Sequence, residues 1–136
     1  MKHEACTQEI FGPFYDVYNA LGYGFLEKVY ENSMAIELRR RGLSVSCQYS
    51  IGVVYRGEIV GSYYADLLVQ DCVIVELKAA RQLIREHEAQ LLNYLNATRC
   101  EVGLLLNFGP EPQVKRKVLD NARKRYHRHS DDRLTD

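Results

Sequence analysis

The hydrophobic pattern at the start of the chain predicts two helices. Residues 7–21 place apolar side chains at helical spacing, and Thr7 is a candidate N-cap. Pro13 interrupts this pattern, so the helix either begins near that residue or is kinked there. A second helix is predicted over residues 26–41, and Gly42 is placed to end it.

The middle of the chain predicts three consecutive strands in a meander. Residues 44–55 alternate apolar and polar side chains, and residues 56–58 form a turn. A second strand follows over residues 59–69, and the polar residues 70–71 make a tight turn into a third strand over residues 72–78. Consecutive strands joined by such short turns pair with each other in antiparallel orientation.

The third predicted strand carries charge in an otherwise apolar run. Because its side chains alternate, Glu76 and Lys78 share one face of the strand, two residues apart. An antiparallel hairpin also brings Asp66 of the preceding strand near Glu76. Two carboxylates repel unless a positive charge lies between them, and Mg²⁺ with oxygen ligands meets that need. The alternative is a solvated pair of Glu76 and Lys78 on an edge strand.

Glu27 lies in the first turn of the second predicted helix. It shares a helical face with Tyr30, Met34 and Leu38, and that face is expected to look inward. A carboxylate there needs a partner, for which the charged patch of the third strand is a candidate. The alternative is a favourable interaction with the positive end of the helix dipole.

Three further elements are predicted after the meander. Residues 82–97 form a helix with His87, Gln90 and Tyr94 along one stripe, which can present Gln90 toward the carboxylates. The alternatives are a surface or capping histidine and a hydrogen-bonded pair on the helix surface. Residues 101–108 predict a strand buried on both faces, and residues 110–126 predict a weaker helix.

Composition and charge limit the class of protein. The 136 residues are 46% hydrophobic and 26% charged, which indicates one globular domain over residues 1–128 and a disordered tail over residues 129–136. The formal net charge is zero, so any site for a polyanion must be local. The basic run over residues 115–128 is either a solvated face or a phosphate-contacting patch.

The apolar runs and the cysteines exclude further classes. No apolar run reaches the roughly 20 residues that span a membrane, and no cleavable leader is seen. The four cysteines are widely spaced, which supports neither a zinc site nor a redox motif. We therefore expect a cytoplasmic protein that does not contact a membrane.

The order of these elements resembles the core of the PD-(D/E)XK nuclease superfamily. Residues 24–30, GFLEKVY, are similar to the signature that names the GxxExxY proteins, a small prokaryotic family assigned to that superfamily. Residues 64–79, 87–95 and 103–109 are also similar to that family. The resemblance implies an α/β (α+β) fold with a restriction-endonuclease-like core. Its mixed sheet is flanked by helices, in the order α-α-β-β-β-α-β-α.

The resemblance also implies roles for the charged residues. Asp66 and Glu76 would hold Mg²⁺ or Mn²⁺ with the backbone carbonyl of Leu77, and Glu27 would extend the metal site. Lys78 would position or activate the attacking water. Gln90 and Tyr94 resemble the QxxxY element of RecB-like members, which orients water and substrate phosphate. The expected substrate contacts are Tyr94, Tyr30, His87, Lys115, Lys117, Arg123, Lys124 and Arg125.

The chain departs from the family pattern at three positions. Ala65 replaces the proline of the superfamily's name, Tyr18 stands where a histidine is expected, and Pro13 interrupts a helix that is usually uninterrupted. The favoured function is a Mg²⁺-dependent nuclease acting on DNA or RNA, because a scaffold gains nothing from converging buried charge. The alternatives are a non-catalytic module that binds nucleic acid or protein, and a structural homodimer formed through an exposed sheet edge.

Overall fold

A computed structural model of the chain describes residues 3–125. The predicted tail over residues 129–136 and the end of the basic run lie outside the described residues. The elements follow one another as α1 (Glu4–Leu21), α2 (Glu27–Arg40), β1 (Val45–Tyr55), β2 (Glu58–Val69), β3 (Val73–Lys78), α3 (Arg85–Asn96), β4 (Val102–Phe108), β5 (Pro112–Val118) and the short 3-10 helix η1 (Asn121–Arg123).

The strands form one mixed sheet in the order β1-β2-β3-β4-β5. β3 and β4 are parallel neighbours joined through α3, whereas the other adjacent pairs are antiparallel. The predicted mixed sheet flanked by helices is therefore confirmed. β3 is the central strand, so the alternative, a solvated pair of Glu76 and Lys78 on an edge strand, is wrong.

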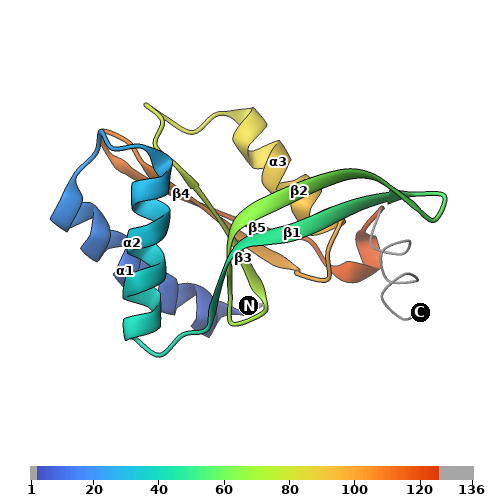
Figure 1. Ribbon diagram of the computed structural model, residues 1–136, viewed down its shortest axis with the longest axis horizontal. Coiled ribbons are helices and arrows are strands. Elements are labelled where there is room, and N and C mark those ends of the chain that lie inside the picture. Colours follow the sequence, from blue (N-terminus) through green and yellow to red (C-terminus); the bar gives the residue numbers. More distant parts are fainter. Residues whose placement is uncertain (1–2, 126–136) are drawn as a thin grey trace.

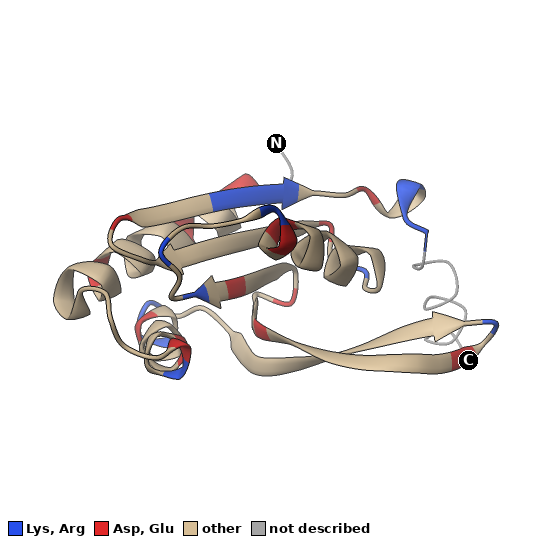
Figure 2. Cartoon of the chain, turned by 90° about the horizontal axis from the view of Figure 1, so that it is seen from above, with Lys and Arg blue, Asp and Glu red and all other residues tan. Residues whose placement is uncertain are grey.

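The hairpin β1–β2 is much longer than its pairing with β3. β2 pairs with β3 only over residues 67–69, while its pairing with β1 continues to Glu58. The distal part of the hairpin consequently projects beyond β3 as a two-stranded arm (Figure 1 and Figure 2). The predicted turn at Gln70 and Asp71 is confirmed, with positive φ angles of 54° and 55° at these residues, as a tight hairpin turn requires.

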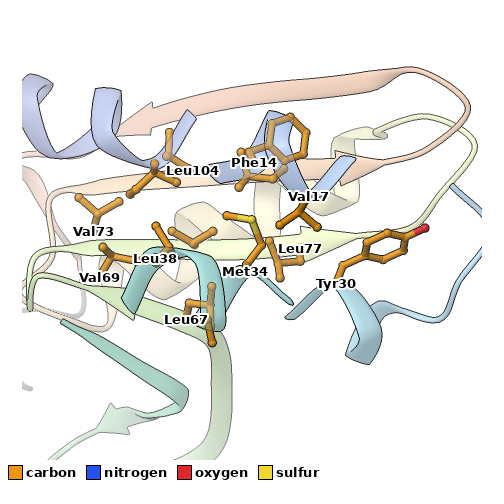
Figure 3. Close-up of a cluster of buried hydrophobic side chains, with 14 of the residues drawn as sticks. Phe14, Val17, Tyr30, Met34, Leu38, Leu67, Val69, Val73, Leu77 and Leu104 are labelled. Atoms are coloured by element: carbon orange, nitrogen blue, oxygen red, sulfur yellow. The ribbon is translucent and has the colours of Figure 1, made fainter. Parts of the chain in front are cut away.

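Two apolar clusters, one on each face of the sheet, hold the helices in place. α1 and α2 contribute Phe14, Tyr30 and Met34 to the first cluster, which covers β3 and β4 (Figure 3). α3 covers the opposite face through the second cluster, around Leu91 and Leu95. Full burial of one such side chain contributes about 1.5–3 kcal/mol, so these faces stabilise the layered arrangement.

The first helix differs from its prediction at both marked residues. α1 begins at Glu4 and continues through Pro13, so the helix does not begin near the proline. Thr7 is not the N-cap, because it lies within the first turns and its hydroxyl donates a hydrogen bond to the carbonyl of Glu4 at 2.9 Å. Burial of Ile10 and Phe14 on either side of Pro13 offsets the hydrogen bond that the proline removes.

The helix predicted over residues 110–126 is a strand followed by η1. β5 pairs along the whole of β4, from Val102 opposite Val118 to Phe108 opposite Pro112. Without β5, the backbone of a strand whose residues are all buried would be left unpaired along one edge. This long-range demand outweighs the weak helical pattern of the segment. Among the described residues, no helix combines the length and apolar character that a membrane crossing requires.

Tyr30 anchors the loop that begins α2, and its side chain is fully buried. Its hydroxyl donates to the carbonyl of Gly22 at 2.7 Å and accepts the backbone N–H of Phe25 at 3.2 Å. Its ring stacks on Phe108, with the centroids 4.2 Å apart. The prediction that Tyr30 contacts substrate is therefore wrong. Its hydroxyl already donates one hydrogen bond and accepts another within the protein, and its ring packs against Phe108.

We predict that Tyr30→Phe lowers the free energy of unfolding by about 1–3 kcal/mol, because it leaves a backbone carbonyl and a backbone N–H without their partner. Urea denaturation measures the change. Tyr23→Phe is the matched control, since Tyr23 is 60% exposed nearby. Equal unfolding midpoints for the two variants would contradict the anchoring role.

Candidate active site

Asp66 and Glu76 meet where β2 and β3 separate. Leu67 pairs with Val75, and at the next position side chains replace the backbone ladder. Glu76 Oε1 accepts the backbone N–H of Asp66 at 2.8 Å, and Asp66 Oδ2 accepts the backbone N–H of Leu77 at 2.8 Å. Each carboxylate is thus held by the backbone of the opposite strand, and the two lie together as the hairpin geometry predicts.

The acidic pair lies in a poorly solvated position. Glu76 is only 4% exposed. Burial, reinforced by the negative charge of Asp66, raises the pKa of Glu76 to about 8. Burial also raises the pKa of Asp66, although the hydrogen bond from Leu77 opposes that rise. Burial and mutual repulsion therefore oppose ionisation of both carboxyl groups, and a bound cation would offset that penalty.

Lys78 is the positively charged residue nearest to Glu76 along β3. It is half-buried, at the end of β3, and its charge acts to lower the pKa of both Asp66 and Glu76. None of the ion pairs shorter than 4.0 Å within residues 3–125 includes Lys78. The ammonium group thus lies near the acidic pair without a direct ionic contact to it.

Helix α2 brings two further carboxylates toward the pair. Glu27 is exposed at the first residue of the helix, and its charge acts to raise the pKa of both Asp66 and Glu76. Glu31, one turn later, also acts to raise the pKa of Asp66. The expectation that Glu27 lies on the buried face of the helix is wrong. The buried face of α2 begins at Tyr30, about one turn after Glu27.

Glu31 is a residue of this site that the sequence reasoning missed. Its side chain is buried, and it forms an ion pair with Lys28 at 2.8 Å and accepts a hydrogen bond from Gln48 Nε2 at 2.7 Å. The available signal was the i+4 spacing from Glu27, which places both on one side of the helix. Both oxygens of Glu31 have protein partners, so it contributes charge and position.

Helix α3 faces the same region with its predicted polar stripe. Gln90 Nε2 donates to the Tyr94 hydroxyl at 2.9 Å. The pKa of Tyr94 is raised by burial and by the charge of Glu76. His87 Nδ1 accepts the backbone N–H of Ile84 at 3.2 Å, so the capping alternative for this histidine is confirmed. Burial and the charge of Lys78 lower the pKa of His87, which keeps the imidazole neutral near pH 7.

The donor atoms fit a hard divalent cation, although no larger acidic cage is present. Within residues 3–125, no three His, Cys, Asp or Glu side chains gather closely enough to bind a metal by themselves. Asp66 and Glu76 each engage one oxygen with the backbone, and their second oxygens make no hydrogen bond to the described part of the chain. Mg²⁺ commonly binds through one or two carboxylates and keeps several waters.

The basic residues of β5 and η1 divide into exposed and structural groups. Lys115 lies in the row that runs from Glu76 through Leu105, about 10 Å from Glu76 by the spacing of two strands. Lys117 forms an ion pair with Glu88 at 2.6 Å. Figure 2 shows this basic strand on the sheet edge away from the hairpin arm. Arg123 and Arg125 are exposed.

Lys124 is a structural residue. Its ammonium group donates to the carbonyls of Thr98 at 2.8 Å and Cys100 at 2.5 Å, and burial lowers its pKa to about 8. The prediction that Lys124 contacts substrate phosphate is therefore wrong, because its charge is used to close the loop before β4.

Comparisons with known proteins agree with this architecture. The family model described as the PD-(D/E)XK nuclease superfamily matches residues 4–118. A search of curated proteins finds no match. The crystal structure of SSO0001 is similar to this chain with a TM-score of 0.51 and 18% sequence identity. The likeness covers 79% of this chain and 58% of that one, and it concerns the fold alone.

We predict that Glu76→Gln stabilises the metal-free protein at high pH. A carboxyl whose pKa rises from 4.5 to about 8 on folding binds its proton more tightly in the folded state. Its stabilising effect is thus complete below pH 4.5 and is lost as the pH rises to 8. Glutamine stays neutral and keeps an acceptor for the Asp66 N–H, so we expect a gain of about 2–4 kcal/mol at pH 9.

Urea denaturation with a chelator present, at pH 5 and pH 9, measures this difference. Glu111→Gln is the control, because Glu111 is exposed. An advantage of Glu76→Gln that is the same at both pH values would contradict the prediction.

Proposed function

This chain belongs to the PD-(D/E)XK nuclease superfamily, and from that premise we propose that it is a Mg²⁺-dependent nuclease of the GxxExxY family. It would hydrolyse phosphodiester bonds of DNA or RNA. The observation that carries the proposal is the reciprocal anchoring of Asp66 and Glu76, with Lys78 on the same face of the central strand. Buried like charges destabilise a fold, so a functional use accounts for them best.

The metal would be held at the fork between β2 and β3. Asp66, Glu76 and the backbone carbonyl of Leu77 would hold Mg²⁺ or Mn²⁺, and Glu27 would extend the site from α2. When bound, the ion supplies positive charge to the non-bridging oxygens of the scissile phosphate. The backbone hydrogen bonds keep the two carboxylates oriented, so little reorganisation is needed when substrate arrives.

The remaining side chains act on water and phosphate. Lys78 orients the attacking water and offsets the negative charge that develops on the phosphorane. Gln90 donates to the Tyr94 hydroxyl, which leaves the phenolic proton free to bind a phosphate oxygen or water. His87, a neutral imidazole in the same stripe, would contact substrate through Nε2, because its Nδ1 is engaged by the backbone.

The exposed cations would position the polynucleotide. Lys115, Arg123 and Arg125 are exposed, and Lys117 adds a partly exposed ammonium on the same strand as Lys115. Contacts of this kind fix the backbone of a nucleic acid without reading its sequence. They also make binding weaken as the salt concentration rises.

We predict that Asp66→Asn and Glu76→Gln each weaken Mn²⁺ binding at least tenfold, because each removes an anionic ligand at the fork between β2 and β3. Calorimetric titration of Mn²⁺ into each protein measures the affinity. Asp71→Asn is the matched control, because Asp71 is exposed in the hairpin turn and asparagine tolerates its positive φ. A wild-type protein that binds no Mn²⁺, even with an oligonucleotide present, would contradict the metal site.

We further predict that Lys78→Ala lowers the rate of oligonucleotide cleavage by about 10²–10⁴-fold, the range for loss of a group that assists proton transfer. Mn²⁺ binding by the same variant stays within a few-fold of wild type. Gel assays with Mg²⁺ measure cleavage, and Arg40→Ala, with a 73% exposed side chain, is the control. If wild type and Lys78→Ala, purified in the same way, cleave at equal rates, the cleavage comes from a contaminating nuclease. The protein would then be a binding module.

A further inference from the structure

We propose that the cavity between α3 and the hairpin arm receives one unpaired base of a single-stranded nucleic acid, stacked on Tyr63. The inference rests on the proposed nuclease function and names its substrate class. The cavity has a volume of about 540 Å³, and its lining includes Val53, Tyr63, His87, Gln90, Asn93 and Tyr94. This size is within the range of sites that bind small organic groups.

The cavity exists because β2 leaves β3 early. β3 pairs with β2 only up to the Leu67–Val75 pair, so the arm beyond that position has α3 as its neighbour in place of a strand. The arm supplies Val53 and Tyr63, and α3 supplies the polar wall. The fork that holds the acidic pair therefore also opens the adjoining space.

Tyr63 is the aromatic residue that the hairpin arm contributes to the lining of this space. The residue is 48% exposed, and its ring centroid lies 6.0 Å from that of Tyr94 at an interplanar angle of 45°. A Cβ atom at Gly61 would lie 3.2 Å from Cε2 of Tyr63, so the glycine leaves room for the ring to lie across the strand. Gly61 and Tyr94 thus lie beside the ring, and stacking of a base on an aromatic ring is a sequence-tolerant interaction.

The lining suits a base better than a phosphate. Among the described residues that line the cavity, none is Lys or Arg, and Glu86 contributes a carboxylate that repels phosphate. Gln90 and Asn93 carry amide groups, which can donate to and accept from the edge of a base. His87 accepts a backbone N–H through Nδ1, which leaves Nε2–H as a donor. These groups therefore complement the base of a nucleotide, which is uncharged, and not its phosphate.

The cavity adjoins the candidate active site through α3, although Asp66, Glu76 and Lys78 do not line it. Tyr94 lines the cavity and is close enough to Glu76 and Asp66 for their charges to act on its pKa. His87 lines it as well and feels the charge of Lys78. A base bound there would place its own phosphate toward the carboxylates. Because a paired base hides both its edge and its faces in a duplex, the substrate that fits is single-stranded.

Fluorescence anisotropy with a chelator present tests this without relying on cleavage. The probes are a fluorescein-labelled single strand of 12 nucleotides, its duplex, and single strands with one abasic position placed at each site in turn. We expect the single strand to bind wild type at least tenfold more tightly than the duplex. One abasic position should weaken wild-type binding by about 5- to 150-fold, the range that base–aromatic stacking supplies.

The variants separate stacking from general binding. Tyr63→Leu should lose the same factor for the intact strand and become insensitive to the abasic position, because leucine keeps apolar cover but offers no ring face. Tyr63→Phe should bind as wild type does. Tyr55→Ala is the matched control, since Tyr55 is 61% exposed at the end of β1 and does not line the cavity. Equal losses for Tyr63→Leu and Tyr55→Ala, or an abasic effect that persists in Tyr63→Leu, would overturn the inference.

The same probes distinguish this inference from the proposed function. Mg²⁺-dependent cleavage of the duplex, with tight duplex binding and no effect of Tyr63→Leu, would overturn the base site and leave the nuclease standing. The expected pattern of binding, with no cleavage of any probe in Mg²⁺ or Mn²⁺, would support the base site and overturn the nuclease.

Discussion

The separation of β2 from β3 at Asp66 and Glu76 is the constraint on which the site depends. In an uninterrupted hairpin the backbone groups of the two strands would hydrogen-bond to each other at this position. The side chains would then not be needed as acceptors. Here each carboxylate accepts a backbone N–H from the opposite strand, so the end of the ladder is closed by acids. The exchange satisfies the two N–H groups and orients both carboxylates at once.

The location of this exchange in the central strand determines its electrostatics. β3 has neighbours on both sides and helices on both faces, so Glu76 cannot turn to solvent. Desolvation and the charge of Asp66 then act in the same direction, and Lys78 only partly opposes them. The charges of Glu27 and Glu31 on α2 act in the same direction on Asp66. A divalent cation would relieve this imbalance while using the oxygen donors that are already oriented.

Sequence reasoning was most successful where one local pattern answers one question. The alternation of β3 predicts the face that Glu76 shares with Lys78, and the turn at Gln70 and Asp71 predicts that Asp66 comes near. It failed where a distant contact outweighs the local pattern. Tyr30 and Lys124 are suitable residue types for substrate contact, yet the polar group of each donates a hydrogen bond to a backbone carbonyl of a loop. Tyr30 bonds to Gly22, and Lys124 bonds to Thr98. Glu31 was missed because a buried acid can be recognised only when its partners, Lys28 and Gln48, are in place.

The sequence by itself determined the order of the elements from α1 to β4, the hairpin that joins Asp66 to Glu76, and the faces of the central strand. These depend on periodicity, turn residues and pairing between segments that are close along the chain. Only the tertiary structure decided that residues 112–118 form a strand, that β3 is central, and that α3 and the hairpin arm line an open cavity. Each of these depends on which backbone or side-chain groups remain unpaired after the local elements have formed, and that is settled by contacts between distant segments.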